Sequence, residues 1–180
     1  MSTPRKTSTD WHAQGRKSRA EGKAFEKRIS EALDYYAEYR VAYIEKTPEP
    51  MKVLRSMGRG QFLACFEKKA QPDYQGTAGG GISVMFEAKF TDKDRITQDY
   101  VSDGQTKYLR RHSSRGAKCY VIVGFSNGKA YRIPFAVWDN MKRIYGRKYV
   151  TPADLEQYEI VERNGILLVL HRTKGEHSHD

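Results

Sequence analysis

The chain has 180 residues, of which 32 are Lys or Arg and 22 are Asp or Glu, so the formal net charge is +10 and the pI is close to 9.6. This length is typical of one domain that buries its own core, and the excess positive charge favours a polyanionic partner, with nucleic acid as the first expectation. No apolar run is long enough for a transmembrane helix and the first residues are polar, so we expect a protein that neither spans a membrane nor is secreted, located in the cytoplasm.

The first 18 residues are expected to form a disordered basic arm. Residues 1–28 contain eight Lys or Arg and three Asp or Glu, a net charge of +5, and such an arm either contacts DNA or only increases solubility. The candidate DNA-binding residues here are Arg16, Lys17, Arg19 and Lys23. A helix is expected from residue 19 to residue 39, because Phe25, Ile29, Leu33 and Tyr36 form one apolar stripe. Glu26 lies on the flank of that stripe.

An extended segment over residues 39–46 leads into Pro48 and Pro50, which cannot continue a central strand. The chain is therefore expected to leave the sheet in an excursion spanning about residues 50–70, which interleaves apolar and basic residues and returns as a strand near Asp73. Its candidate DNA-binding residues are Lys52, Arg55, Arg59, Lys68 and Lys69. Cys65 in this segment and Cys119 further on lack Cys-x-x-Cys spacing, and both are expected to be buried thiols.

The strongest pattern in the chain is the alternation over residues 82–90, in which Ile82 and every second residue after it are apolar. A strand repeats every two residues, so this apolar set is expected to face a core while Glu87 and Lys89 share the opposite face. Asp73 is brought back toward them by a turn at residues 79–81. Carboxylates suit Mg²⁺ and a lysine suits phosphate, so we favour a metal-dependent phosphodiesterase site over the alternative of a solvated strand face.

The remaining patterns predict a helix over residues 102–114 carrying Gln105, and strands at 119–125 and 130–133 joined by an Asn-Gly turn. A short helix near 135–144 and a small hairpin of 158–162 with 166–170 follow, and residues 173–180 form a polar tail. The order predicts an α/β fold with a mixed central sheet flanked by helices, and a single domain over residues 19–172.

These motifs resemble the RecU-type Holliday junction resolvases, a family within the restriction-endonuclease-like nucleases. The resemblance covers roughly residues 22–138 and rests on five segments in order: Gly22-Lys23-Ala24-Phe25-Glu26, the segment 44–50, Asp73-Tyr74-Gln75-Gly76, Phe86-Glu87-Ala88-Lys89, and Gln105. It implies a restriction-endonuclease-like core and a protruding basic stalk formed by the excursion. The proline segment and the approach to Asp73 depart from the family pattern, which indicates a divergent member, with a phage origin as one alternative.

The resemblance also implies the site and the activity. Asp73 and Glu87 would be the metal-binding carboxylates, Lys89 the catalytic lysine, Glu26 a further acidic group and Gln105 an accessory residue, with the backbone carbonyl of Ala88 as a third metal ligand. The expected protein is a homodimeric endonuclease that uses Mg²⁺, with Mn²⁺ able to substitute, and resolves four-way DNA junctions by paired nicks during recombination or repair. Two alternatives stay open: a nuclease of the same fold that cuts linear duplex, and a non-catalytic architectural DNA-binding protein.

Overall fold

The computed structural model describes residues 8–66 and 70–171, and only the backbone of residues 8–13. Its centre is a five-stranded sheet in the order β1-β4-β5-β7-β8. The strands are β1 (Ala42–Lys46), β4 (Tyr74–Ala78), β5 (Ile82–Thr91), β7 (Lys118–Phe125) and β8 (Ala130–Pro134). Neighbouring strands are antiparallel except β5 and β7, which are parallel. The predicted α/β class with a mixed central sheet is therefore confirmed.

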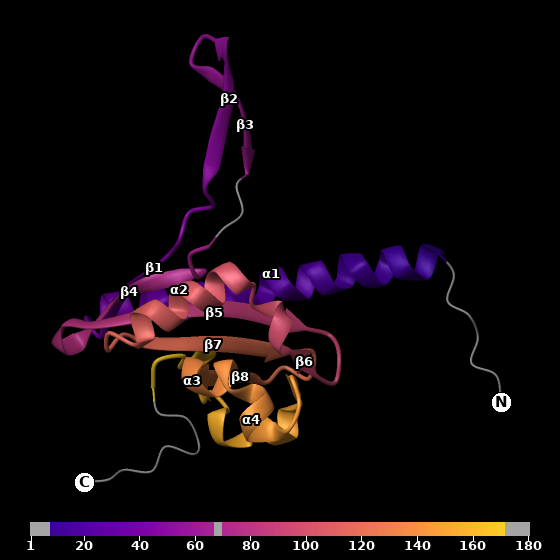
Figure 1. Cartoon of the computed structure of the whole chain (residues 1–180), viewed down its shortest axis with the longest axis vertical. Coiled ribbons are helices and arrows are strands. Elements are labelled where there is room, and N and C mark those ends of the chain that lie inside the picture. The colour runs from indigo at the N-terminus through magenta and orange to yellow at the C-terminus, as the bar shows by residue number, and fades with distance from the viewer. Residues whose placement is uncertain (1–7, 67–69, 172–180) are drawn as a thin grey trace.

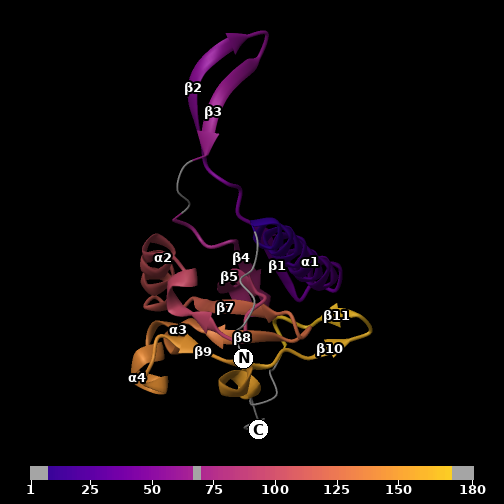
Figure 2. The ribbon, with the colours of Figure 1, turned by 90° about the vertical axis from the view of Figure 1, so that its right-hand side faces the viewer.

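One face of the sheet is covered by the long helix α1 (Ser8–Glu38), as Figures 1 and 2 show. Phe25, Ile29 and Tyr36, members of the predicted stripe, are buried there against Phe86 and Ile122. Gly124 of β7 lies under this helix, where an added Cβ would be 2.8 Å from the Phe25 ring. The sequence therefore identified the buried face of this helix.

The start of α1 differs from the prediction of a disordered arm over residues 1–18. The helix begins at Ser8, and residues 1–7 lie outside the described part of the chain. Residues 8–22 have Ala, Lys, Arg, Glu or Gln, which have high helix propensity, at seven of 15 positions, and Lys17 lies 3.8 Å from Glu21 one turn later. Gln14 also donates to Asp92 after β5 at 3.4 Å. Local propensity thus extends the helix beyond the apolar stripe.

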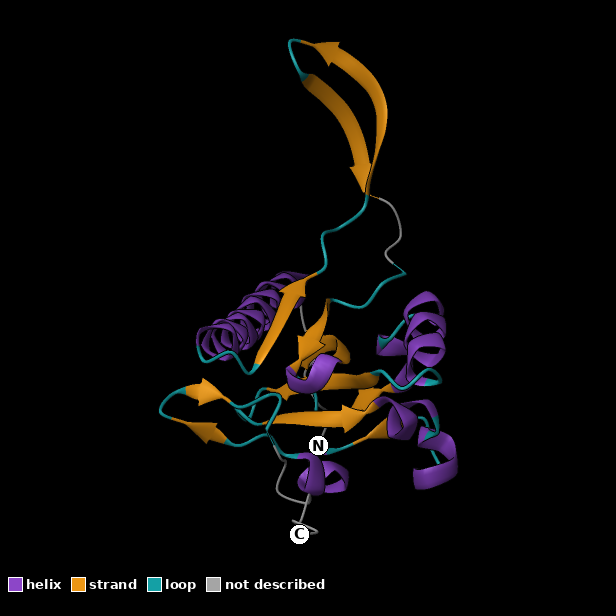
Figure 3. Cartoon of the chain, turned by 90° about the vertical axis from the view of Figure 1, so that its left-hand side faces the viewer, coloured by secondary structure: helices purple, strands orange, loops and turns teal. Residues whose placement is uncertain are grey.

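The opposite face of the sheet is covered by three shorter helices, which Figures 2 and 3 show on the side away from α1. These are α2 (Asp103–Ser113), α3 (Phe135–Asp139) and α4 (Met141–Tyr145). Met85 of β5 packs here with Leu109 of α2, so both faces of β5 are buried, whereas the sequence predicted one. Ile82, expected in the core, is exposed at the start of the strand. The expected helix over 135–144 is broken at Asn140 into α3 and α4.

The excursion after Pro50 forms a two-stranded antiparallel ribbon, β2 (Met51–Gly58) with β3 (Gln61–Phe66), which we call the stalk. Figure 1 shows it projecting away from the sheet and helices. Every residue of both strands is exposed, including apolar ones such as Phe62 and Phe66. The protruding stalk is confirmed, but Cys65 is exposed rather than buried, because the ribbon has no second layer to cover it; Cys119 is buried as predicted.

Short elements complete the fold. Two small sheets pair β6 (Ile96–Thr97) with β9 (Tyr149–Val150) and β10 (Glu162–Arg163) with β11 (Ile166–Leu167). Three 3₁₀ helices occur, η1 (Gly79–Gly81), η2 (Gln98–Tyr100) and η3 (Pro152–Tyr158). The predicted second hairpin is present but shorter than expected. The expected tail over 173–180 lies outside the described residues, and among the helices that are described none is long and apolar enough to cross a bilayer.

Candidate active site

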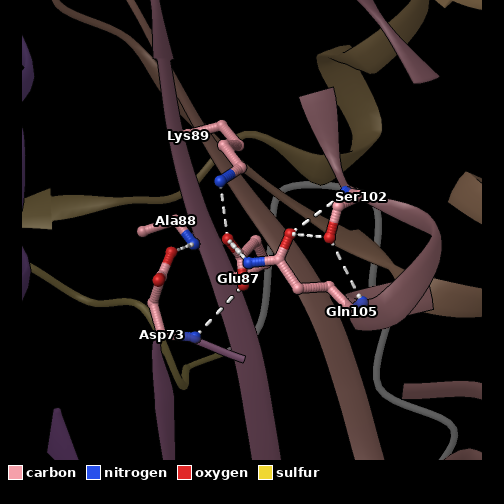
Figure 4. Close-up of polar contacts among 6 residues, drawn as sticks. All are labelled: Asp73, Glu87, Ala88, Lys89, Ser102 and Gln105. Carbon is pink, nitrogen blue, oxygen red and sulfur yellow. Dashed lines mark hydrogen bonds and ion pairs between the residues drawn. The ribbon is translucent and has the colours of Figure 1, made fainter. Parts of the chain in front are cut away.

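Asp73 and Glu87 occupy facing positions at one end of the β4–β5 pair. The ladder pairs Tyr74 with Phe86, so one further step places Asp73 opposite Glu87. Side chains of facing residues lie on the same side of an antiparallel pair. The backbone N–H of Asp73 donates to Glu87 Oε2 at 3.1 Å, as drawn in Figure 4. The structure thus brings together the two carboxylates that the sequence singled out, 14 residues apart.

The backbone of Ala88 also belongs to this site. Its N–H donates to Asp73 Oδ2 at 3.2 Å, so the β4-facing edge of β5 is directed at the aspartate here. In an antiparallel ladder a residue directs its N–H and its C=O to the same edge, and the Ala88 carbonyl therefore faces the same space. The residue that would oppose Ala88 in the register is Pro72, which has no N–H to donate. The proline leaves this carbonyl available to another partner.

Glu87 is fully buried, although it carries a carboxylate. Lys89, two residues along the same strand face, lies with its Nζ 2.6 Å from Glu87 Oε1. Burial, together with the neighbouring Asp73, raises the pKa of Glu87 to about 7, while Lys89 lowers it. Two adjacent carboxylates in a desolvated position favour the approach of a cation, and the Lys89 ammonium group supplies part of the compensating positive charge.

Gln105 completes the surroundings of Glu87 from α2. Its Nε2 donates to Glu87 Oε1 at 2.6 Å. Its Oε1 accepts from the backbone N–H and the hydroxyl of Ser102 at 3.0 and 2.9 Å, and Ser102 Oγ accepts from the Gln105 N–H. This is a capping box at the start of α2, and it fixes the amide so that its NH₂ group points at Glu87 (Figure 4). Ser102 was not predicted as a site residue, although the Ser-x-x-Gln spacing is a recognisable signal of this cap.

Glu26 is linked to the site through Lys46. It lies on α1, where Oε2 is 2.6 Å from Lys46 Nζ at the end of β1. The hydrogen bond from Lys46 to Glu26 is the largest influence on the pKa of Lys46 and raises it. The negative charges of Glu26 and Asp73 raise this pKa further. The sequence did not single out Lys46, whose position beside the site follows from its pairing with Tyr74.

The predicted DNA-binding residues fall in two groups. One group lies on α1: Arg16, Lys17, Arg19 and Lys23. The other lies on the stalk, with Lys52 and Arg55 on β2 and Arg59 at the turn that joins β2 to β3. All three stalk residues are exposed. Lys68 and Lys69 lie outside the described residues.

The donor set is compatible with a hard divalent cation. Asp73, Glu87 and the Ala88 carbonyl are oxygen donors from one short stretch of two neighbouring strands, and oxygen is the ligand atom that Mg²⁺ prefers. Within the described part of the chain there is no cluster of three acidic, histidine or cysteine side chains. Two carboxylates and a carbonyl are sufficient here, because Mg²⁺ usually retains several waters and binds one or two carboxylates.

Comparison with known proteins identifies the family to which the chain belongs. The family model described as "RecU: Recombination protein U" matches residues 20–173, which is most of the chain. The protein therefore belongs to the RecU family, in agreement with the resemblance found in the sequence.

Individual relatives are distant. A protein named Holliday junction resolvase RecU from Streptococcus gordonii is 29% identical over 120 residues, which is 63% of this chain and 60% of that relative. A protein of the same name from Lactiplantibacillus plantarum is 27% identical over 146 residues, 75% of this chain and 70% of the relative. The matched region thus spans about 60% of the length of the streptococcal relatives. Among solved structures, the Holliday junction resolvase Hjc of Archaeoglobus fulgidus matches with a TM-score of 0.41 and 15% identity, covering 64% of this chain and 78% of that chain.

Proposed function

We propose that this protein is a Mg²⁺-dependent endonuclease that resolves four-way DNA junctions by paired nicks. The observation that carries the proposal is the assembly of Asp73, Glu87 and Lys89 at one end of the β4–β5 pair. Membership of the RecU family and the name of its relatives, Holliday junction resolvase, support the choice of substrate. The net charge of +10 suits a DNA ligand.

The roles follow from the contacts. Asp73, Glu87 and the Ala88 carbonyl would hold Mg²⁺, which supplies Lewis-acid polarisation of a phosphate oxygen and lowers the pKa of water. Lys89 would lie beside the scissile phosphate and stabilise the negative charge that develops on its oxygens. Gln105 keeps Glu87 in one orientation, and the capping box keeps Gln105 in place. The chain would thus present a preformed set of oxygens and one ammonium group to the phosphate.

Paired nicks require two sites, so the proposed active form is a homodimer. A dimer with two-fold symmetry would place one copy of the site on each of two opposed strands of a junction, which has near two-fold symmetry itself. The stalk would then enter the branch point, because it protrudes from the body and carries Lys52, Arg55 and Arg59 in exposed positions. Branch selectivity is thereby assigned to the stalk and hydrolysis to the body.

The test compares end-labelled four-way junctions with linear duplex of equal length, with and without Mg²⁺. We expect symmetric nicks in the junction that require Mg²⁺ or Mn²⁺, and much weaker cutting of the duplex. Equal cutting of both substrates would identify a nuclease that acts on linear DNA. Binding without any cleavage, in either metal, would identify an architectural DNA-binding protein.

A further inference from the structure

A groove of about 1080 Å³ lies between α2 and the segment that contains α3 and α4, and Thr106, the residue that follows Gln105 on α2, lines it. We call it the α2–α4 groove. Figures 2 and 3 show its three helices on the same side of the sheet, opposite α1. It was not among the DNA-binding positions predicted from the sequence, which lie on α1 and the stalk.

The groove and its rim are positively charged. Its lining includes Arg110, Lys142, Arg143 and Lys148, and Lys107 and Arg111 lie on the exposed side of α2. Three carboxylates, Asp99, Asp103 and Asp139, also line it, so the lining has four cations against three anions and a net charge of +1, while Lys107 and Arg111 lie outside the lining.

One of those carboxylates is already neutralised. Asp139 receives two hydrogen bonds from Arg110, at 2.9 and 2.6 Å, and this pair joins α2 to α3 across the groove. The other three lining cations, Lys142 and Arg143 on α4 and Lys148 before β9, make no ion pair within the described part of the structure. By contrast, on the far side of the molecule Lys27 lies 3.6 Å from Glu31 and Lys129 lies 3.1 Å from Glu159. The α2–α4 groove therefore holds positive charge that the chain itself does not neutralise.

Helix α2 connects this charge to the active site. Its buried side holds Gln105 against Glu87. Lys107 and Arg111 follow on the exposed side, roughly 3 and 9 Å further along the helix axis at 1.5 Å per residue. A duplex carries one phosphate charge per roughly 1.7 Å of its axis, so several phosphates of a DNA arm that starts at Glu87 fall within reach of these cations.

We infer that the α2–α4 groove binds the phosphate backbone of the duplex arm that leaves the active site. The inference rests on the proposed function and adds to it a third DNA-contacting surface, separate from α1 and the stalk. The ligand is the sugar–phosphate backbone of double-stranded DNA, because lysines and arginines at an open, solvated surface recognise phosphate charge without reading base edges. Its role is to hold the arm in line so that the scissile phosphate stays at Glu87.

The test uses the full chain carrying Lys142→Gln, Arg143→Gln and Lys148→Gln together. Arg110 is left in place because it joins α2 to α3. A matched control carries Arg40→Gln, Lys129→Gln and Arg163→Gln, three exposed positions outside α1, the stalk and the groove, and removes the same net charge. Binding of a four-way junction is measured in Ca²⁺ over a range of salt concentrations. Each phosphate contact contributes about 0.9 to the log–log slope, so we expect the groove variant to lose about 2 to 3 from the slope and the control to lose less than about 1.

A second measurement identifies the phosphates. Neutral methylphosphonates are placed in the junction arm within about half a helical turn, roughly 5 base pairs, of the cleavage site. They should weaken binding by the parent and have little further effect on the groove variant. Equal slope losses in the two triple variants, or methylphosphonates that leave the affinity of the parent unchanged, would overturn the inference. If the groove variant fails to fold, the methylphosphonate result with the parent decides alone.

Cleavage by the parent tests the proposed function, whereas the salt slope of the groove variant tests the groove. A parent that cleaves junctions in Mg²⁺, with a groove variant that binds with the parental salt slope, rejects the groove and keeps the resolvase. A parent that binds but never cleaves rejects the resolvase. Retention of DNA affinity by the groove variant, with loss of binding to an acidic peptide tested in parallel, would reassign the groove to a protein partner.

Discussion

Asp73 and Glu87 face each other across β4 and β5, and the N–H of Asp73 donates to the Glu87 carboxylate at 3.1 Å. A backbone donor from one residue therefore orients the side chain of the other. The same aspartate accepts from the N–H of Ala88 at 3.2 Å. Each carboxylate is thus fixed by the backbone of the opposite strand, and the site depends on the register of this pair.

Removing either charge should abolish catalysis and preserve DNA binding. For Asp73→Asn and Glu87→Gln we expect cleavage in Mg²⁺ or Mn²⁺ to fall by at least about 10²–10³-fold, the scale on which one preorganised charge-stabilising group acts. Junction binding in Ca²⁺ should survive, since it depends on lysines and arginines elsewhere. Asp94→Asn, an exposed aspartate in the loop after β5, is the control and should cleave normally. Ordinary rates for both site variants would reject the assignment.

The capping box should couple helix stability to the site. Ser102→Ala removes the side chain that caps α2 and contacts the Gln105 amide, so we expect a loss of about 1 kcal/mol in the free energy of unfolding. Cleavage should fall several-fold as well, because the amide that donates to Glu87 is no longer held. Ser102→Thr retains the hydroxyl and serves as the control. Urea unfolding and single-turnover cleavage measure the two effects, and a loss of stability without any loss of rate would show that Gln105 is not a positioning residue.

The stalk should determine substrate choice without contributing to the stability of the body. Because β2 and β3 pair from Met51 to Phe66, the deletion has to remove both strands; we propose replacing residues 51–66 with a short Gly-Ser linker. The thermal unfolding midpoint should stay close to that of the parent, since no stalk residue is buried. The preference for four-way junctions over linear duplex should collapse, while Mn²⁺ binding persists. Arg59→Gln at the tip tests the charge alone, and a shortened protein that still prefers junctions would place selectivity in the body.

Substitution of glycine by alanine should lower the free energy of unfolding at Gly76 and raise it at Gly22. An added Cβ at Gly76 would lie 2.0 Å from the carbonyl oxygen of Tyr43 on the neighbouring strand, so Gly76→Ala has to separate β1 from β4 and should destabilise the protein by several kcal/mol, among the largest single-site effects. At Gly22 in α1 nothing lies within 4 Å, and Gly22→Ala should stabilise by roughly 0.5–1 kcal/mol. Calorimetry on both variants measures the difference. A mild effect at Gly76 would contradict the close pairing of β1 and β4.

The sequence predicted most of the sheet and singled out the carboxylates that the structure brings together in the candidate site, for reasons that lie in short-range patterns. Strict alternation around Glu87 identified β5, the apolar stripe identified the buried side of α1, and Asn127-Gly128 identified the β7–β8 turn. Each of these signals is complete within about ten residues of chain. The facing of Asp73 and Glu87 followed from a tight turn between two strands.

The failures arise where a partner from elsewhere in the chain decides the outcome. The burial of Glu87 depends on the packing of α2 over β5, which no local pattern encodes. Cys65 has apolar neighbours, yet it is exposed because its ribbon lacks a covering layer. The helical start of α1 was also missed: its charge was interpreted as disorder, whereas the segment is helical, with a Lys17–Glu21 pair one turn apart and a contact from Gln14 to Asp92.

The stalk should open locally far more often than the central sheet does. A two-stranded sheet that buries no side chain is marginal on its own in water, whereas β5 lies at the centre of the body with helices on both faces. Amide hydrogens of β2 and β3 should therefore exchange with solvent orders of magnitude faster than those of β5, which open only on global unfolding. Proteases should cut first at the stalk, and contact with a branch point should slow both processes there. Hydrogen exchange of this one ribbon would thus report on engagement of the substrate independently of cleavage.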